Sequence, residues 1–516
     1  MKSNLTTSLK GVNKIKWNLV FKGILVGFIT GLLVVLYRLG IEYAEKGALH
    51  GYSVLRDKPA YILLWLILIV IIGVIVYKLN KWEPNAMGSG IPQVKGMAVY
   101  GMKINYLRVI IVRYISGVLT SLFGVSMGRE GPSIQIGACG SKIASEYICK
   151  NKLEDNCLAT AGASAGLAAA FNAPLSGMIF ALEEVHRSFS PLVLIAATTA
   201  ALTSDMVAKV AFGLNTELNF IHVPQMPVKY YILLPIIGIA SGVIGAITNK
   251  VLLGAGNIYK KFPLLFRPMI ALLIALPFGL FLPQVLGGGN NLINISVAGK
   301  LTISLMIICL IGKLIFTSVC FGSGIPGGIF MPILSIGALT GCILGSISVG
   351  FGMDSKYISV FCVCAMAGAL SGSVKAPITS ILLIAEMTGS LVHLLPVATT
   401  TFIALFTSDI MKTLPIYDVL LERLNIEGNN GKKMKKGAII EVAIEAGSFI
   451  EGKEIKDIIW PETSLIVGVR RGDEELIPNG STRLVAGDYL IIVSDGKSLK
   501  NINEEFFSIC HYNNLG

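Results

Sequence analysis

The apolar positions of the chain fall into two kinds of segment. Near the N-terminus, the runs at about 18–37 and 61–79 are continuous and long enough to cross the roughly 30 Å hydrocarbon core of a bilayer. Further along, the apolar segments become short and are interrupted by Gly and Pro, as in MGSGIPQVKG (87–96), MGREGPSIQIGACG (127–140), AFNAPLSGMIFALEE (170–184), FGSGIPGGIFMPILSIGAL (321–339) and VKAPITSILLIAEMTGS (374–390). Broken helices occur at membrane depth only where their open backbone lines a cavity or is buried in protein. The pattern therefore predicts an all-α polytopic membrane protein built from broken helices.

Two stretches of the first half recur in the second half. The Ala-Pro…Glu pattern of 173–183 matches 376–386 with an offset of 203 residues. The Gly-x-x-x-Pro pattern of 128–132 matches 322–326 with an offset of 194 residues. We therefore predict two related halves, with insertions between the copies. Paired interruptions of this kind indicate a transport site between the halves.

The two ends of the chain differ from the apolar body. Residues 1–17 are basic and polar, and the run that follows lacks the cleavage site of a signal peptide, so we expect a retained span and a cytoplasmic N-terminus. The predicted transmembrane domain covers 18–425. A basic linker at 426–437 follows, which we expect at the inner membrane surface. Residues 438–516 predict a small cytosolic α/β domain. Its β-like runs are 438–444, 464–471 and 488–494.

Composition strengthens the membrane interpretation. Hydrophobic residues make up 53% of the 516 residues and charged residues only 14%, against about 25% in soluble chains. Residues 431–516 hold 11 basic and 13 acidic side chains, whereas the rest holds 32 basic and 18 acidic ones. A basic excess of this kind is typical of cytoplasmic loops in membrane proteins. We expect no nucleic-acid partner, because no recognition module accompanies the charge.

Several function classes are disfavoured. The nine cysteines form no CxxC pair, so we expect neither a zinc site nor a disulfide framework. A membrane-embedded hydrolase using Glu183, Glu184 and His186 is disfavoured because the chain has no HExxH or CxxC motif and no second histidine lies nearby. We therefore expect no enzyme activity, no metal ion and no cofactor.

Three Gly-Pro motifs carry the chemistry. GSGIP (88–92), GREGP (128–132) and GSGIPGGIF (322–330) each place Gly and Pro beside a predicted helix start. A helix N-terminus offers unpaired N–H groups and a partial positive charge, so it binds anions. Several such termini at one place would make a weak anion site, from which a transported ion can also leave. The alternative is that the glycines serve close helix packing. Three motifs in one chain favour the anion site.

The three motifs, in this order and spacing, resemble those of the CLC family of chloride channels and transporters. The resemblance runs from about 17 to 424 and includes the helix at 170–185 and the tyrosine in LPIYDVL (414–420). It implies the CLC fold, in which the two halves form an inverted repeat, and a homodimer with one pathway per subunit. It also implies the bacterial plasma membrane, with both termini cytoplasmic.

The resemblance assigns five residues to the chloride pathway. Ser89 and Tyr417 match the residues whose hydroxyls face the central anion. Ile329 and Phe330 match those whose backbone amides complete the site. Glu130 matches the gating glutamate, whose ionised side chain occupies an anion site and swings out when protonated. A carboxylate at helix N-termini competes with chloride, which supports the gate, although Glu130 also fits a helix-capping role.

A second carboxylate distinguishes an exchanger from a channel. In the family's exchangers a glutamate near the inner end of one helix takes protons from the cytoplasm. Glu184 falls on that position and Glu183 lies beside it, so a chloride/proton antiporter is favoured. The alternative is a passive voltage- or ligand-gated chloride channel of the same fold. Gln93 and Lys95 replace acidic residues of the best-known bacterial exchangers, which we expect to alter the electrostatics of the dimer or of the intracellular side and to leave the assignment of the transport residues unchanged.

The C-terminal run 445–493 resembles the RCK-C (TrkA-C) module of bacterial potassium-uptake regulators. The matching pieces are Gly452-Lys453, the strand 467–471 with Gly472, Pro478 and Gly487-Asp488. That module dimerises and binds a small effector between its copies, which is cyclic di-AMP in some bacterial relatives.

The resemblance therefore offers cyclic di-AMP as a candidate effector of this domain. The crevice would involve Ile455, Asp457, Ile458 and Trp460. The arginine that often contacts phosphate in that family is not obvious here. The alternative is a scaffold that only strengthens the dimer.

Overall fold

The computed structural model describes most of the chain and divides it into two compact units. It describes residues 2–99, 102–149, 152–187, 190–214, 216–218, 223–429, 438–444, 447–461, 464–471, 474–494, 505–506 and 508–510. One unit comprises Met1–Cys149, Glu154–Arg187 and Leu192–Leu421, and the other Lys150–Leu153, Ser188–Pro191 and Glu422–Gly516. We call them the membrane unit and the C-terminal unit. Residues 430–437 of the predicted linker, and Gly472, lie outside the described residues.

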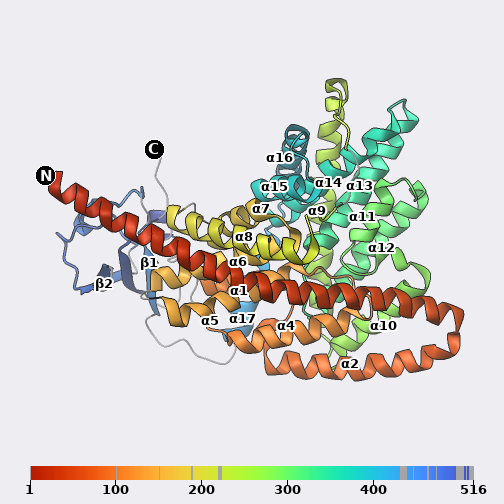
Figure 1. Cartoon of the computed structure of the whole chain (residues 1–516), viewed down its shortest axis with the longest axis horizontal. Coiled ribbons are helices and arrows are strands. Elements are labelled where there is room, and N and C mark those ends of the chain that lie inside the picture. Colours follow the sequence, from red (N-terminus) through yellow and green to blue (C-terminus); the bar gives the residue numbers. More distant parts are fainter. Residues whose placement is uncertain are drawn as a thin grey trace. The chain divides into compact units, whose positions relative to one another are not determined.

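The membrane unit is helical throughout (Figure 1). Its first half holds α1 (Lys2–Asp57), α2 (Ile62–Trp82), α3 (Ile91–Val99), α4 (Tyr106–Ser121), α5 (Glu130–Ile148), α6 (Lys152–Phe171), α7 (Pro174–Phe180) and α8 (Pro191–Phe212). Its second half holds α9 (Leu234–Tyr259), α10 (Phe266–Phe281), α11 (Asn290–Val297), α12 (Ile303–Gly322), α13 (Phe330–Gly350), α14 (Ile358–Val374), α15 (Pro377–Thr388) and α16 (Leu394–Ile410). A last helix, α17 (Ile416–Asn429), follows. Seven of the described helical segments are long and apolar enough to cross a membrane. The expected all-α membrane body is confirmed.

Short helical segments connect the long ones. The 3₁₀ segments of this unit are η1 (Pro59–Tyr61), η2 (Pro84–Ala86), η4 (Val228–Leu233), η5 (Pro283–Val285) and η6 (Ser355–Tyr357). The segment η3 (Ala181–His186) continues α7 as a π-helix. π-Helical turns are rare and occur frequently at functional sites.

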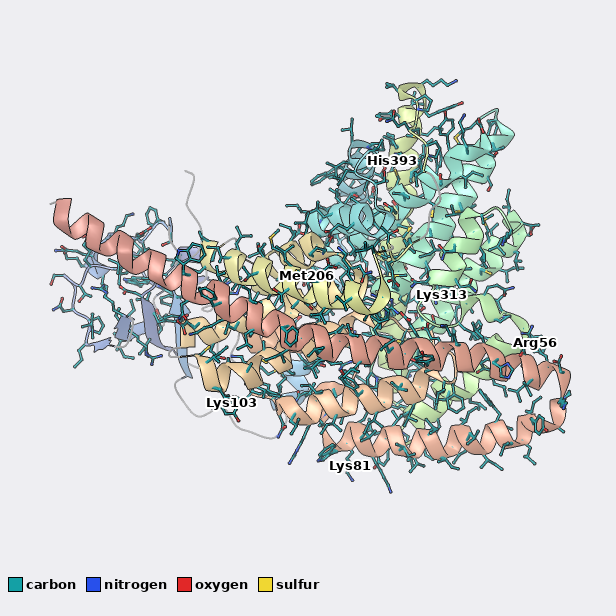
Figure 2. The ribbon with its side chains drawn as sticks, viewed as in Figure 1. Arg56, Lys81, Lys103, Met206, Lys313 and His393 are labelled. Carbon is teal, nitrogen blue, oxygen red and sulfur yellow. The ribbon has the colours of Figure 1, made fainter. Side chains whose placement is uncertain are left out.

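Long apolar helices differ in what surrounds them. α14 is buried almost along its whole length, between α13, α9 and α16. α2 buries only Ile69, Gly73, Val76 and Asn80 and exposes large apolar side chains such as Leu63, which is 69% exposed. An exposed apolar helix of this length is suited to contact with lipid. α1 and α2 form a hairpin, with Arg56 at the turn and Lys81 at the far end of α2 (Figure 2).

Close glycine contacts repeat between the two halves. A Cβ on Gly27 of α1 would lie 2.4 Å from the Ala200 carbonyl oxygen of α8. A Cβ on Gly242 of α9 would lie 2.6 Å from the Ala404 carbonyl oxygen of α16. Small residues allow this backbone approach between helices. In each half, the first and the last helix are therefore packed against each other through a glycine.

The structure corrects one register of the predicted repeat. Gly128 pairs with Gly328 in an isolated antiparallel bridge, and each precedes a helix by two residues. The equivalent of the 128–132 motif is therefore 328–332, with an offset of 200 residues and not 194. The predicted match of Gly128 with Gly322 is wrong, because Gly322 ends α12 and does not directly precede α13. The two offsets, 200 and 203, now differ by only three residues.

The C-terminal unit contains a four-stranded antiparallel sheet. Its strands are β1 (Ala438–Ala443), β2 (Ser464–Arg471), β3 (Glu474–Leu476) and β4 (Tyr489–Ser494), in the order β1-β4-β2-β3. A 3₁₀ segment, η7 (Ile455–Asp457), lies between β1 and β2. The sheet residues Val442, Val469 and Leu490 form a core with Leu484 and Phe506. The three predicted strands are confirmed, and β3 is an addition too short for its pattern to predict.

Candidate functional site

Three loops that precede helices meet in the centre of the membrane unit. Gly128 and Gly328 exchange two backbone hydrogen bonds of 2.7 Å. The Gly327 amide donates to the Gly88 carbonyl oxygen at 3.1 Å. The loops before α3, α5 and α13 are therefore tied together by their own backbones. These loops are the three Gly-Pro motifs singled out in the sequence.

The helices α5 and α13 begin at this junction without a side-chain cap. Arg129 and Ile329 occupy their N-cap positions, and neither side chain bonds to the first turn. The first amides of a helix have no partner within the helix. Ile329 and Phe330 are buried here, so their amides are available to an anion in a dry environment.

Two hydroxyl groups face the same place. Ser89 is 3% exposed and Tyr417 is fully buried. Neither hydroxyl has a hydrogen-bond partner within the described residues, although the two groups approach one another. The Tyr417 ring stacks on Phe330 with centroids 6.0 Å apart, which brings α17 to the start of α13. A buried polar group without a partner is costly, so these hydroxyls are poised for a ligand.

The carboxylate of Glu130 lies next to the glycine bridge. It is 1% exposed, and its Oε2 has no hydrogen-bond partner within the described residues. A Cβ on Gly128 would lie 2.0 Å from that oxygen. Gly128 therefore leaves the space that the carboxylate occupies.

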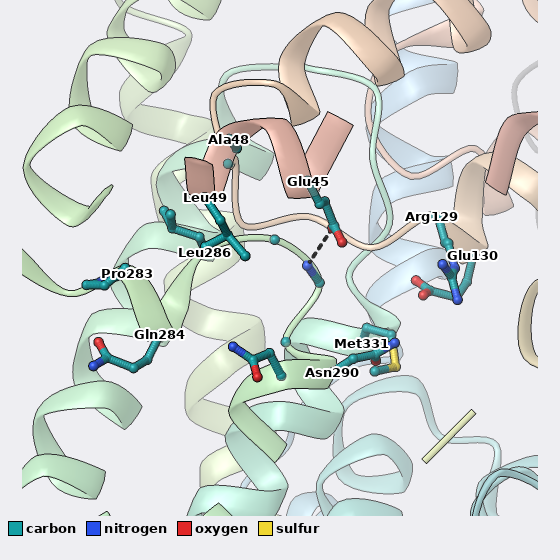
Figure 3. A pocket seen from close by; sticks show the side chains of 15 residues that line it. Glu45, Ala48, Leu49, Arg129, Glu130, Pro283, Gln284, Leu286, Asn290 and Met331 are labelled. Carbon is teal, nitrogen blue, oxygen red and sulfur yellow. Dashed lines mark hydrogen bonds between the residues drawn. The ribbon is translucent and has the colours of Figure 1, made fainter. Parts of the chain in front are cut away.

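Glu130 also lines a cavity of about 170 Å³ (Figure 3). Glu45, Arg129, Asn290 and Met331 line the same cavity, and Glu45 accepts a hydrogen bond of 3.2 Å from the Gly288 amide. The gate candidate thus stands between this cavity and the junction of the three loops.

Arg129, directly before Glu130, is fixed by two carboxylates. It donates to Glu42 at 2.8 Å and to Glu217. Arg38 bonds to the same two carboxylates, and Asn290 donates to Glu217 at 2.7 Å. The sequence offered no signal for Glu42 or Glu217, because they come from α1 and from the chain that follows α8.

Arg113 holds the loop that carries Ser89 through hydrogen bonds. It is fully buried on α4 and donates to the Gly88 carbonyl oxygen at 2.5 Å and to Gln135 of α5 at 2.6 Å. Gln135 in turn donates to the Asn85 carbonyl oxygen at 2.9 Å. These bonds hold the Ser89 loop against α5.

Glu184 lies in the π-helical segment η3 and is buried. Lys95 of α3 places its ammonium 3.2 Å from Glu184 and 2.5 Å from Asp418 of α17. Arg187 bonds to the other Asp418 oxygen. Lys95 therefore contacts the candidate proton carrier directly, a pairing for which the sequence offered no signal.

Glu183 has a different environment from Glu184. Its carboxylate accepts hydrogen bonds from the amides of Ile378 and Thr379, at 3.1 and 2.7 Å, and from the Thr379 hydroxyl at 2.7 Å. It therefore caps α15. Its equivalent, Glu386, accepts from the Leu175 and Ser176 amides at 3.0 and 2.7 Å and caps α7. Each half of the membrane unit thus caps a helix of the other half, and Glu183 is already engaged.

The four regulatory candidates differ in how exposed they are. Trp460 stacks on Phe506 with centroids 5.5 Å apart and donates its indole N–H to the Ile455 carbonyl oxygen at 2.8 Å. Ile458 is 7% exposed and belongs to the core, whereas Asp457 is exposed. Of the four, Asp457 is exposed, Ile455 and Trp460 are half-buried, and Ile458 alone is buried.

Comparisons with known proteins agree with this geometry. A model of the voltage gated chloride channel family matches residues 66–409, and a model of the TrkA-C domain matches residues 439–506. The H(+)/Cl(-) exchange transporters ClcA of Salmonella agona and Salmonella typhimurium are each 31% identical over 422 residues, which is 78% of this chain and 88% of each relative.

Solved structures show the same architecture. A slow cyanobacterial Cl-/H+ antiporter matches with a TM-score of 0.76 and 26% identity, over 80% of this chain and 99% of the antiporter. A CLC-type fluoride/proton antiporter matches with a TM-score of 0.63 and 23% identity, over 76% of this chain and 95% of its own. Together with the two family models, these matches confirm the expected fold of both parts of the chain.

Proposed function

The chain belongs to the voltage-gated chloride channel (CLC) family and ends in a TrkA-C domain, and we propose that it exchanges chloride for protons across the bacterial plasma membrane. Relatives named as H(+)/Cl(-) exchange transporters support the proposal. So does the slow Cl-/H+ antiporter among the solved structures.

One observation carries the proposal. Three buried polar atoms without partners in the described residues, the hydroxyl oxygens of Ser89 and Tyr417 and Oε2 of Glu130, gather where α5 and α13 begin. Hydroxyl donors and free amides suit chloride, which needs hydrogen bonds but no full positive charge. In this proposal chloride rests between Ser89, Tyr417 and the amides of Ile329 and Phe330.

The proposed coupling follows from competition at Glu130. When ionised, its carboxylate occupies the space that Gly128 leaves and competes with chloride for the helix amides. When protonated, it loses its charge and moves toward the cavity, so chloride can pass. Chloride passage thereby requires proton binding.

Glu184 supplies protons from the cytoplasmic side in this proposal. Buried ionisable groups in membrane segments are costly and usually functional. Glu183 is not needed for this step, because its oxygens cap α15.

A passive chloride channel is the second candidate, and one observation favours it. Lys95 lies 3.2 Å from Glu184 and stabilises its ionised form, which opposes proton uptake. A channel of this fold would use the same chloride groups and move no protons.

Proton movement separates the two candidates. Purified protein in liposomes with a chloride gradient and no proton gradient should drive protons uphill. E130Q and E184Q should both abolish proton movement, and E184Q should still pass chloride. Chloride flux without proton movement in the wild-type protein would favour the channel.

The assembly and the C-terminal domain complete the proposal. We propose a homodimer with both termini in the cytoplasm and with cyclic di-AMP as an effector that binds at the TrkA-C domain near Ile455 and Asp457. Calorimetric titration of the full-length protein with cyclic di-AMP tests the ligand, with D457A as the variant that should weaken binding. No heat of binding would leave the scaffold role.

A further inference from the structure

Four charged side chains meet at the end of η3. Lys95 lies between Glu184 and Asp418, at 3.2 and 2.5 Å, and Asp418 also bonds to Arg187. The Lys95 side chain is 1% exposed, whereas those of Asp418 and Arg187 are 31% and 41% exposed. One buried lysine therefore serves two carboxylates, one buried and one open to solvent.

The charges of this cluster balance only when Glu184 is ionised. Two carboxylates then face Lys95 and Arg187. When Glu184 binds a proton, the same four groups carry one net positive charge. Asp418 follows Tyr417 directly on α17. This extra charge therefore arises beside the Tyr417 hydroxyl, which faces the junction of the three loops before α3, α5 and α13, called the anion junction from here on.

We propose that Lys95 is a positioning residue that shares its charge between Glu184 and Asp418 and so links proton binding at Glu184 to anion binding beside Tyr417. With Glu184 ionised, Lys95 holds it and favours its charged form. With Glu184 protonated, Asp418 is the only ionised partner of Lys95 in this cluster, and the extra positive charge favours chloride at Tyr417. The inference rests on the proposed function, because it requires Glu184 to carry protons.

The other described groups near Glu184 differ from Lys95 in their position or charge. Lys95 comes from α3, Asp418 and Tyr417 from α17, and His186 and Arg187 from the segment of Glu184 itself. Tyr417 is a neutral phenol at ordinary pH. Arg187 bonds to Asp418 on the exposed side of the cluster. Glu183 points instead to the start of α15.

Two substitutions should move the pH profile of proton transport in opposite directions. The measurement is proton-coupled flux in liposomes as a function of internal pH, with the half-maximal pH as the readout. K95Q removes the positive partner of Glu184, so the proton is held more strongly and the half-maximal pH rises, by about one unit or more. D418N removes a nearby negative charge, so Glu184 becomes the one carboxylate of the cluster that Lys95 contacts. The ionised form of Glu184 is then favoured, and the half-maximal pH falls.

Controls separate charge from structure. K95R keeps the charge and should restore most of the wild-type profile. K356Q is the matched control, because Lys356 forms an exposed pair with Asp354 at 2.8 Å, and it should leave the profile unchanged. If K95Q fails to fold, the fall expected for D418N still tests the proposal. Shifts in the same direction for K95Q and D418N, or no shift in D418N, would overturn it.

The test also distinguishes failure of the proposed function. If the wild-type protein moves no protons, or if E184Q still moves them, the proposed antiport or its carrier is wrong. If the wild-type protein pumps protons and E184Q does not, while K95Q and D418N keep the wild-type half-maximal pH, only the role of Lys95 is wrong.

Discussion

At the residue scale, the anion junction depends on two glycines whose lack of a side chain leaves space for neighbouring atoms. Gly128 and Gly131 have no Cβ, and a Cβ on Gly131 would lie 2.5 Å from the Ser89 carbonyl oxygen. Because these two Cβ atoms are missing, the loops can approach one another and the Glu130 carboxylate has room. The space around Glu130 is therefore small enough that one methyl group should change its position.

We expect G128A to displace Glu130 from the anion junction. The new Cβ would lie 2.0 Å from the carboxylate oxygen, which is the far end of a flexible side chain and moves more easily than backbone. Chloride turnover in liposomes should rise severalfold, and the number of protons moved per chloride should fall. G254A is the control, since a Cβ at Gly254 meets no atom within 4 Å. Unchanged turnover and coupling in G128A would contradict the proposed gate.

The glutamates show how far sequence alone reaches at this scale. Glu130 and Ser89 could be assigned because each stands in a short local motif that resembles a motif of the CLC family. Glu183 and Glu184 are adjacent in sequence, yet one caps α15 and the other contacts Lys95. Their partners lie 195 and 89 residues away, and only the packed structure decides which carboxylate faces which partner.

At the element scale, the two halves hold each other through reciprocal helix caps. Glu183 caps α15 and Glu386 caps α7. The sequence repeat indicated that these glutamates were equivalent, but not that each reaches into the opposite half. The offset of 194 for the first motif failed for a related reason, because Gly-x-x-x-Pro occurs both at the end of α12 and at the start of α13. A pattern that short does not fix a register.

The caps predict that Glu183 and Glu184 differ in what their loss affects. E183Q and E386Q each leave one acceptor oxygen for two amides, so one charge-assisted hydrogen bond becomes neutral and the other is lost, at a cost of about 1–3 kcal/mol in the free energy of unfolding. Both should lower the unfolding temperature in detergent by similar amounts. E183Q should keep proton coupling, whereas E184Q should lose it. Loss of coupling in E183Q at normal stability would restore Glu183 as a proton carrier.

At the scale of the whole molecule, the two units have separate cores. The membrane unit buries apolar helices around α14, and the C-terminal unit buries its own sheet residues with Phe506. α17 carries Tyr417 at its start and leads out of the membrane unit at its end. Within the membrane unit, Asp418 ties the first turn of α17 to Lys95 and Arg187. Tyr417 is therefore held in place by contacts that do not involve the C-terminal sheet.

One ion pair with a buried carboxylate lets the C-terminal unit be perturbed by itself. Asp488 is fully buried and accepts two hydrogen bonds from Arg471, at 2.8 and 2.7 Å, and one from the Val485 amide at 3.0 Å. The hydrogen bond and charge of Asp488 hold the pKa of Arg471 above its usual range. D488N should therefore unfold this small domain and leave the membrane unit intact.

Truncation after residue 429, which keeps α17 whole, should preserve chloride/proton exchange in liposomes and abolish any response to cyclic di-AMP. D488N should give the same result in the full-length chain, which controls for the loss of the tail itself. The expectation follows because Tyr417 is anchored through Asp418 inside the membrane unit. If the truncated protein folds but no longer passes chloride, the C-terminal unit holds α17 in its transporting position, and the domain is part of the pathway's support instead of a separable regulator.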